Sequence, residues 1–455
     1  MKGIKKISCS VIAVCTLFIG CEKYLDVKPD QSLSTPNSVA DLQALLDYED
    51  RLTYNYPCAG DLAATYYYLN DADWRTRDEE ARKTYLWEKS ADNYLDWSYG
   101  YQNIFLANVV IENVSKATLG SLTENHRNQV NGAGHFFRGW SFFHLAQIFA
   151  PPYNLKGSNV NEMGIPLRLT ADIDAPTVRA SLEETYQQVL HDLKIATFYL
   201  DANSSTPTRP NKKTAYAAIS KTYLVMGDYK QALLYADSCL GLYSTLINYN
   251  TLDVNKALPF ELFNPEVLFQ SSIRADAGNL DPSRARVDSV LYDSYDNDDL
   301  RKSIFFRKNT DGSYSFKGSY YGVNSGALFS GIAVDEVLLI KAECLARLDR
   351  KEDALEGLNT LLKSRWKTDR FEPYSASTAG EVLGIILAER HKELAFRGGI
   401  FWSDRRRLNQ EAQFSTNLRR RMEGGDYTIE PNSLLYTFLI PVSVIQESGI
   451  SQNPR

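Results

Sequence analysis

Residues 212–242, KKTAYAAISKTYLVMGDYKQALLYADSCLGL, predict two helices that pack against each other. The first helix ends near Gly227, the chain turns through Asp228, and the second helix places the small Ala232 where the two axes come close. Small residues at a crossing let antiparallel helices approach, and such helix–turn–helix units are typical of tetratricopeptide repeats. This stretch therefore predicts a mostly α protein built from tetratricopeptide-like helix pairs.

A second pair is predicted over residues 335–362, where Ala342 and Ala354 hold the matching positions. An insertion at about 243–332 separates the two pairs and is rich in Asn, Asp, Gly, Ser and Tyr. Long ordered loops on a helical frame usually carry function, so this loop-rich insertion is a candidate functional region. It contains two predicted short strands, Val267–Ser271 and Ser313–Lys317.

Apolar residues that recur every three or four positions predict further helices. The clearest is 181–200, which opens on a capping box of Ser181 and Glu184, and Thr378 with Glu381 repeats that start signal. The remaining predicted helices are 39–50, 97–116, 124–149, 212–226, 229–242, 334–348 and 351–365. We expect one domain over residues 21–455, with helix pairs near 124–149, 181–242 and 334–400.

The N-terminus has the three parts of a secretory signal: Lys2, Lys5 and Lys6, then the apolar residues 7–19, then Gly20. The apolar run is too short to span a bilayer, which takes roughly 20 residues. We expect residues 1–20 to be a signal peptide, and Cys21, directly after the break, to carry the lipid of a bacterial lipoprotein. The alternative is an ordinary cleaved signal with an incidental cysteine. No later segment is predicted to cross a membrane.

The charge balance argues against a nucleic-acid partner. The 455 residues carry a formal net charge of −6 at pH 7, whereas phosphate contacts need clustered Lys and Arg. The arginines that do cluster, at 405–407 and 419–421, are interrupted by acidic and polar residues, and we interpret them as a solvated helix face. Cys239 and Cys344 lie among apolar helical residues and are predicted to be small buried hydrophobes.

The sequence shows no recognised catalytic or cofactor motif, neither a Gly-rich phosphate loop nor a His-Glu-x-x-His or Gly-x-Ser-x-Gly pattern. His135 and His144 are predicted on opposite faces of one helix, so they cannot share a metal. The acidic run 293–299 lacks the glycine and the distal glutamate of an EF-hand loop and is interpreted as a solvated turn. We expect no catalytic residue, no metal and no cofactor, although the carboxylate pair of a glycoside hydrolase would meet only in space.

Aromatic residues in polar loops are the better candidates for a binding site. An aromatic plane can stack on the C–H face of a sugar while nearby Asp, Asn and Arg bond to its hydroxyls. Trp74 has charged neighbours of that kind, and a tyrosine pair in the insertion is flanked by glycines. For Trp97, core packing is the simpler interpretation. The predicted ligand-binding residues are Asp71, Asp73, Trp74, Arg75, Trp97, Tyr320 and Tyr321.

The order of these landmarks resembles the SusD/RagB outer-membrane lipoproteins of the Bacteroidetes over nearly the whole chain. The motifs that carry the resemblance are Leu25–Pro29 after Cys21, Trp97 with Tyr101, Ile104, Ala107 and Asn108, Phe137–Leu145 running to Pro151–Pro152, Gly164–Leu167, Gly227–Tyr229, Asn264–Glu266, Glu336–Glu343, Glu389–Leu394, Ile440–Pro441 and Gln452–Pro454. One departure is Arg397-Gly398-Gly399, where the family usually has Glu-Gly, and we expect a local packing change there.

The resemblance implies a SusD-like α superhelix and a role in nutrient capture. Such a lipoprotein would be held at the outer membrane by the lipid on Cys21, facing the cell exterior, and would pass glycan to a SusC-like TonB-dependent transporter without enzymatic activity. In the starch-binding member the ligand platform is aromatic, and only the start of the Trp97 helix falls in a matching motif. The alternatives are a peptide-binding RagB-like component, a tetratricopeptide-type scaffold without a small ligand, and a surface hydrolase.

Overall fold

Helices dominate the computed structural model, which describes residues 36–275, 278–323 and 326–455. Within these ranges the strands are short and pair into five two-stranded sheets, and residues 37–455 form one compact unit. The predicted fold class, mostly α with a few short strands, is confirmed. The predicted signal peptide, Cys21 and Leu25–Pro29 lie outside the described residues.

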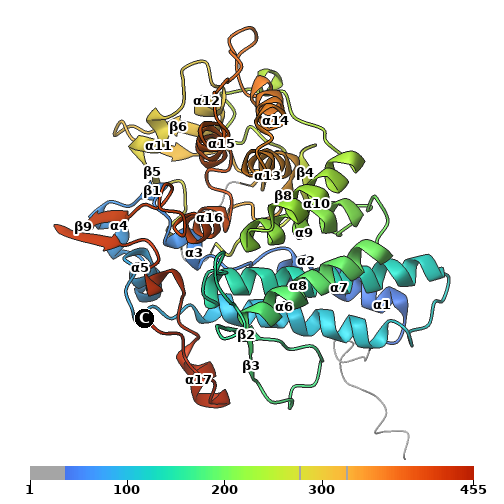
Figure 1. Cartoon of the computed structure of the whole chain (residues 1–455). Helices are drawn as coiled ribbons and strands as arrows, with labels where there is room; N and C mark the ends of the chain where they lie inside the picture. The colour runs from blue at the N-terminus through green and yellow to red at the C-terminus, as the bar shows by residue number, and fades with distance from the viewer. Residues whose placement is uncertain (1–35, 276–277, 324–325) are drawn as a thin grey trace, which may run out of the picture. The chain divides into compact units, whose positions relative to one another are not determined.

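The long helices stack side by side (Figure 1). Helix α7 lies between α6 and α8, and every residue of α7 from Gly132 to Phe149 is buried. The stack continues from α8 through α9 and α10 to α13, α14 and α15. The long helices are α6 (Tyr94–Asn113), α7 (Glu124–Phe149), α8 (Leu182–Tyr199), α9 (Lys212–Met226), α10 (Tyr229–Leu242), α13 (Val334–Arg347), α14 (Lys351–Lys363) and α15 (Ala379–Glu393).

The two predicted helix pairs are present as α9–α10 and α13–α14. Gly227 ends α9 with a left-handed backbone, φ 74°, which glycine adopts without steric cost. Ala232 is fully buried at the crossing, where the Ser220 hydroxyl donates to its carbonyl at 2.7 Å, and Ala354 is fully buried in the second pair. Although about 90 residues separate the pairs in sequence, α10 packs directly on α13, so the insertion leaves the stack continuous.

The predicted start signals are present at the beginning of two helices. Ser181 and Glu184 form the predicted capping box at α8, and Thr378 with Glu381 forms one at α15. Most of the shorter helices come before α6 or after α15 in the chain, and α11 and α12 lie in the insertion. They are α1 (Val39–Leu46), α2 (Glu49–Leu52), α3 (Ala59–Leu62), α4 (Asp71–Arg75), α5 (Glu79–Tyr85), α11 (Ser289–Asp293), α12 (Arg301–Phe305), α16 (Ile400–Leu408) and α17 (Val442–Ser448).

A second hydrophobic core lies under the loops rather than between the long helices. The insertion and residues 58–86 supply most of its side chains, many of them aromatic. The sheets are β1 (Tyr67–Tyr68) with β5 (Arg286–Val287), β2 (Met163–Pro166) with β3 (Arg179–Ser181), β4 (Val267–Phe269) with β8 (Ile332–Ala333), β6 (Phe306–Lys308) with β7 (Tyr314–Phe316), and β9 (Leu418–Met422) with β10 (Gly425–Ile429), all antiparallel.

The prediction of a solvated arginine face is wrong for three of the six residues. Arg406, Arg407 and Arg420 are buried, whereas Arg419 and Arg421 are exposed. Arg407 pairs with Glu343 Oε2 at 2.8 Å and with Asp404 Oδ1 at 2.9 Å, and Arg406 donates to backbone carbonyls of α7 and the residue that follows it. The guanidinium of Arg420 lies 3.5 Å from the centroid of the Tyr85 ring. These arginines cross-link elements far apart in sequence.

The interpretation of run 293–299 as a solvated turn is likewise wrong at its end. Asp299 is 1% exposed and pairs with the fully buried Arg301. Arg301 also bonds Glu389 Oε2 at 2.7 Å and Glu393 Oε2 at 3.0 Å. Glu393 in turn bonds Arg365 at 2.7 Å, so a buried network of ions joins the insertion to α15.

Candidate functional site

The first group of predicted ligand-binding residues, 71–75, forms α4 and is bonded to the tip of the β9–β10 hairpin. The Asp71 carboxylate accepts a hydrogen bond from the Glu423 backbone N–H at 3.0 Å, and Arg75 pairs with the Glu423 side chain. Asp73 accepts from the side chain of Asn70. Trp74 is half-buried, with the Arg82 guanidinium 5.4 Å from its ring centroid. These side chains are therefore partly occupied by neighbouring residues.

Two of the predicted ligand-binding residues, Trp97 and Tyr320, have rings that are enclosed by protein. Trp97 is 6% exposed and packs on Tyr101, with ring centroids 4.6 Å apart. Tyr320 is fully buried, donates to Glu266 Oε2 at 2.8 Å and lies 3.6 Å under the Arg397 guanidinium. Burial also raises the pKa of Tyr320 well above its ordinary value.

Tyr321 stays partly accessible. Its half-buried ring packs edge-on against Tyr54, with centroids 5.7 Å apart. Among the described residues no hydrogen bond or ring contact joins it to α4, so the seven predicted residues are not seen to form one site.

A pocket of about 260 Å³ lies where α5 and α6 begin, and we call it the α5–α6 pocket. Asp78 caps α5 by accepting from the Ala81 N–H at 2.8 Å, and Asn93 is the residue before α6. The pocket is lined by Leu62, Asp78, Glu80, Ala81, Asp92, Asn93, Tyr94, Leu95 and Arg274.

Hydrogen bonds fix the polar walls of the α5–α6 pocket. Glu80 accepts from the Asp92 backbone N–H at 2.6 Å and from Lys83 Nζ at 3.0 Å. Asp92 Oδ2 accepts from the Val442 N–H at 3.1 Å, so the start of α17 holds this wall from outside. Arg274 donates to Oδ1 of the fully buried Asp96 at 3.2 Å. The lining is thus preorganised by residues that are distant in sequence.

Two polar atoms of the lining have no hydrogen-bond partner among the described residues. Asn93 is 6% exposed; its Oδ1 accepts from Thr84 Oγ1 at 3.2 Å, but its Nδ2 is unpartnered. Asp92 Oδ1 is unpartnered as well. The adjacent Tyr94 ring is 48% exposed. Because both atoms are buried, the exposed Tyr94 ring is the lining group that is open to a ligand.

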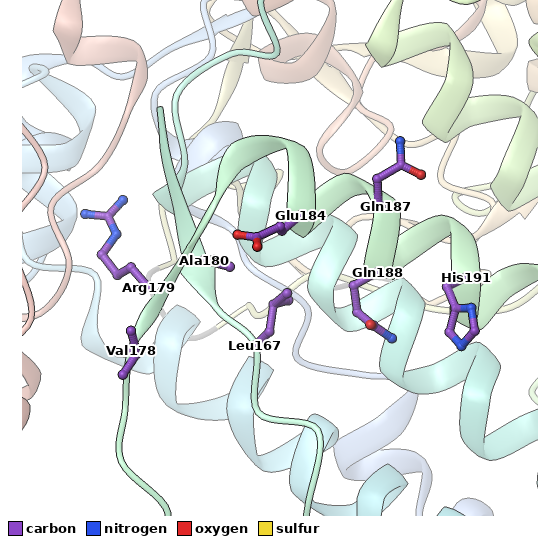
Figure 2. A pocket seen from close by; sticks show the side chains of 8 residues that line it. All are labelled: Leu167, Val178, Arg179, Ala180, Glu184, Gln187, Gln188 and His191. Atoms are coloured by element: carbon purple, nitrogen blue, oxygen red, sulfur yellow. The ribbon is translucent and has the colours of Figure 1, made fainter. Parts of the chain in front are cut away.

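A wider pocket of about 680 Å³ lies beside α8 and β3 (Figure 2). Figure 2 shows Glu184, Gln188 and His191 along α8, opposite Leu167 and Val178. Several of its polar groups already serve the fold. Glu184 completes the capping box of α8, Gln188 donates to Asp192 at 3.0 Å, and Arg179 donates to the Gly164 carbonyl at 2.8 Å.

Sequence reasoning missed the residues of the α5–α6 pocket. Tyr94, an aromatic residue just before the predicted Trp97 helix, could have been chosen, but the prediction favoured other aromatic residues. Asp78 and Glu80 gave no signal beyond a helix start. In the part of the chain that the structure describes, no group of three or more His, Cys, Asp or Glu side chains is arranged to hold a metal. None of the described helices is long and apolar enough to cross a membrane.

Comparisons with protein families give two matches. A family model described as starch-binding associating with outer membrane matches residues 23–224, and a model of the SusD family matches residues 292–439. SusD-like protein P2 of Formosa agariphila is 25% identical over 244 residues, which are 50% of this chain and 45% of that protein. SusD-like protein P38 of the same organism is 25% identical over 247 residues, 51% of this chain and 45% of that protein. The matches thus span less than half the length of these curated relatives.

Solved structures share the fold at low sequence identity. A SusD superfamily protein from Bacteroides thetaiotaomicron has a TM-score of 0.71 at 21% identity, covering 92% of this chain and 100% of that one. A SusD-like carbohydrate binding protein from Bacteroides vulgatus has a TM-score of 0.70 at 20% identity, covering 91% of this chain and 97% of that one.

Proposed function

We propose that this chain, which belongs to the SusD/RagB family, is a nutrient-binding lipoprotein of the outer membrane that captures glycan at the cell surface. The matching family is described as starch-binding, and one structural neighbour is a SusD-like carbohydrate binding protein, which together support a sugar ligand. The observation that carries the proposal is the α5–α6 pocket, where the exposed ring of Tyr94 lies among polar lining side chains.

Capture would combine stacking with hydrogen bonding. The Tyr94 ring offers a flat apolar face to a sugar ring, and the lining carboxylates of Asp78 and Glu80 can accept hydrogen bonds from its hydroxyls. The pocket is smaller than the roughly 300–1,000 Å³ typical of drug-sized ligand sites, so it fits a single sugar residue rather than a whole oligosaccharide. Affinity at one such subsite is expected to be modest, which permits release.

Delivery is the second part of the proposal. A SusC-like TonB-dependent transporter would receive the glycan, and a lipid on Cys21 would keep the binding unit beside it. Tethering raises the effective concentration of a weakly held ligand near its acceptor, so tight binding is not required. We propose that the protein binds glycan without cleaving it. Copurification of a transporter with the detergent-extracted protein, and unchanged oligosaccharide after incubation, test these two points.

The binding site is tested by titrating a panel of oligosaccharides into residues 22–455, with Tyr94→Ala as the variant. Tyr48→Ala is the matched control, because Tyr48 and Tyr94 are each 48% exposed and Tyr48 does not line the pocket. Loss of an aromatic contact worth about 0.5–1.5 kcal/mol weakens binding about 2- to 13-fold in Tyr94→Ala only. Equal loss of affinity in both variants would contradict a binding site at Tyr94. Binding of peptides and of no glycan would favour peptide uptake instead of glycan uptake.

A further inference from the structure

We infer that the loop of residues 167–178, which joins β2 to β3, is the surface that docks on the membrane-embedded transporter. It is the green loop below β2 and β3 in Figure 1. The inference rests on the delivery step of the proposed function and deepens it, because it names the surface that meets the receiving protein.

Exposed apolar side chains are concentrated in and beside this loop. Among the described residues 19 large hydrophobic side chains are exposed, and five of them fall within residues 160–178. Single exposed apolar side chains are ordinary, whereas a group of them on one segment marks an interaction site. The five are Val160, Met163, Leu169, Ile173 and Val178, with Ile173 77% exposed and Val178 69% exposed.

Buried side chains hold the loop in one shape. Asn108, fully buried on α6, donates to two carbonyls of the loop at 2.9 Å each. Arg138, buried on α7, donates to a third carbonyl at 3.2 Å. Within the loop, Arg168 donates to the carbonyls of Asp172 and Ala175 at 2.5 Å each. A surface that is already ordered loses less conformational entropy on binding, so these bonds favour association with a partner.

The loop and the start of the described chain are attached to the same end of α6. The Ala171 N–H donates to Glu112 Oε1 at 3.0 Å, one residue before α6 ends. Thr118, six residues further on, donates its N–H to the Asn37 carbonyl at 2.8 Å. Asn37 follows Cys21 by 16 positions, a span of at most about 58 Å. The proposed lipid on Cys21 thus keeps the loop near the membrane, which favours a partner embedded there.

The charges around Ile173 favour a protein partner over a lipid surface. Asp172 and Asp174 flank Ile173 and are both exposed. Arg168 is the one cation in the sequence of the loop, and its guanidinium already donates within the loop. Negatively charged headgroups would repel the two carboxylates. A protein hollow with an apolar centre and Lys or Arg at its rim fits the loop, and we expect the transporter to present one.

The test copurifies the transporter with the detergent-extracted full chain, identifies it by mass spectrometry, and compares Ile173→Asp with Val290→Asp. Ile173 and Val290 are each 77% exposed, and Val290 lies on α11, outside the loop. A carboxylate placed in a buried apolar contact is expected to weaken association at least about tenfold, whereas the control keeps the native yield of transporter. Native yield with a folded Ile173→Asp protein overturns the inference and leaves the proposed function standing. Absence of the transporter with the native chain overturns the inference and the delivery proposal together.

Two further measurements exclude other causes of a lost association. Ile173→Asp is expected to keep the native melting temperature, because the side chain is exposed; if it melts earlier, Val178→Ser, also at an exposed position, takes its place. Residues 22–455 are also mixed with vesicles of phosphatidylethanolamine and phosphatidylglycerol, and no binding is expected. Vesicle binding that Ile173→Asp abolishes would assign the loop to lipid and overturn the inference.

Discussion

Replacing Arg365 with methionine removes the centre of a buried ion network and leaves two carboxylates without their main partner. Arg365 is fully buried; its Nε donates to Glu393 at 2.7 Å and its Nη2 to both oxygens of Glu266 at 2.9 Å. Burial by itself lowers the pKa of Arg365, but the two glutamates raise it well above its ordinary value, so the network keeps the charge. Removing one partner of such a buried pair costs about 3–5 kcal/mol.

That cost is large against a total stability of about 5–15 kcal/mol. With about 2.1 cal/mol/K of unfolding entropy per residue over roughly 420 residues, the melting temperature should fall by about 3–6 °C. Differential scanning calorimetry of Arg365→Met against Arg370→Met, an exposed arginine in the following loop, measures it. A drop of less than about 1 °C relative to the Arg370 control would refute the reasoning. In the double variant with Glu393→Met, the two losses should fall short of additivity by at least about 1 kcal/mol.

Three further predictions concern the pH dependence that Asp61 gives to stability and the replacement of Gly384 and Gly331 by alanine. Burial raises the pKa of Asp61 to about 7 against the hydrogen bonds from Gly399 and Tyr66 that lower it. Because this pKa exceeds the unfolded value of about 3.9, the contribution to stability is complete below about pH 4 and is lost as pH rises through about 7. Asp61→Asn should flatten the dependence of the unfolding free energy on pH between those limits. Urea titrations at several pH values in which the variant keeps the native pH dependence would contradict the prediction. Gly384→Ala, in α15 with no atom within 4 Å of the added Cβ, should stabilise by about 0.5–1 kcal/mol. Gly331→Ala would place Cβ 1.9 Å from the Phe269 carbonyl oxygen and should destabilise by about 1–3 kcal/mol; equal urea midpoints for the two variants would be the contrary result.

The helical frame could be predicted from the sequence because its signals are local. The capping box of Ser181 and Glu184 begins α8 where the spacing placed it, and Gly227 ends α9. Each of these signals lies within one turn of the boundary that it sets, so no knowledge of distant residues was needed. The stacking of α10 on α13 across the insertion had no such signal, because it depends on contacts between segments far apart in sequence.

Burial of charge could not be predicted for the same reason. Arg420 appears in a basic run, yet its guanidinium reaches the carbonyls of Ala64 and Tyr85, more than 300 positions earlier. Tyr320 appears as a loop aromatic between glycines, yet Glu266 and Arg397 enclose it. A composition window cannot distinguish a solvated polar residue from one whose partners come from elsewhere in the chain.

The sequence prediction came near the α5–α6 pocket but did not name the residues that line it. The search located residues 71–75 and the start of the Trp97 helix, which lie beside the α5–α6 pocket in sequence. The sequence prediction selected other aromatic side chains and missed Tyr94, because its exposure at the pocket depends on how α5 and α6 pack together.

The bond between Asp92 and the Val442 N–H joins positions 350 residues apart. Nearly the entire chain must therefore emerge from the ribosome before this wall of the pocket can close. A chain truncated before α17 would lack this hydrogen bond, and so would a chain that is still being synthesised. This wall of the pocket is therefore completed only after the helical frame has been translated.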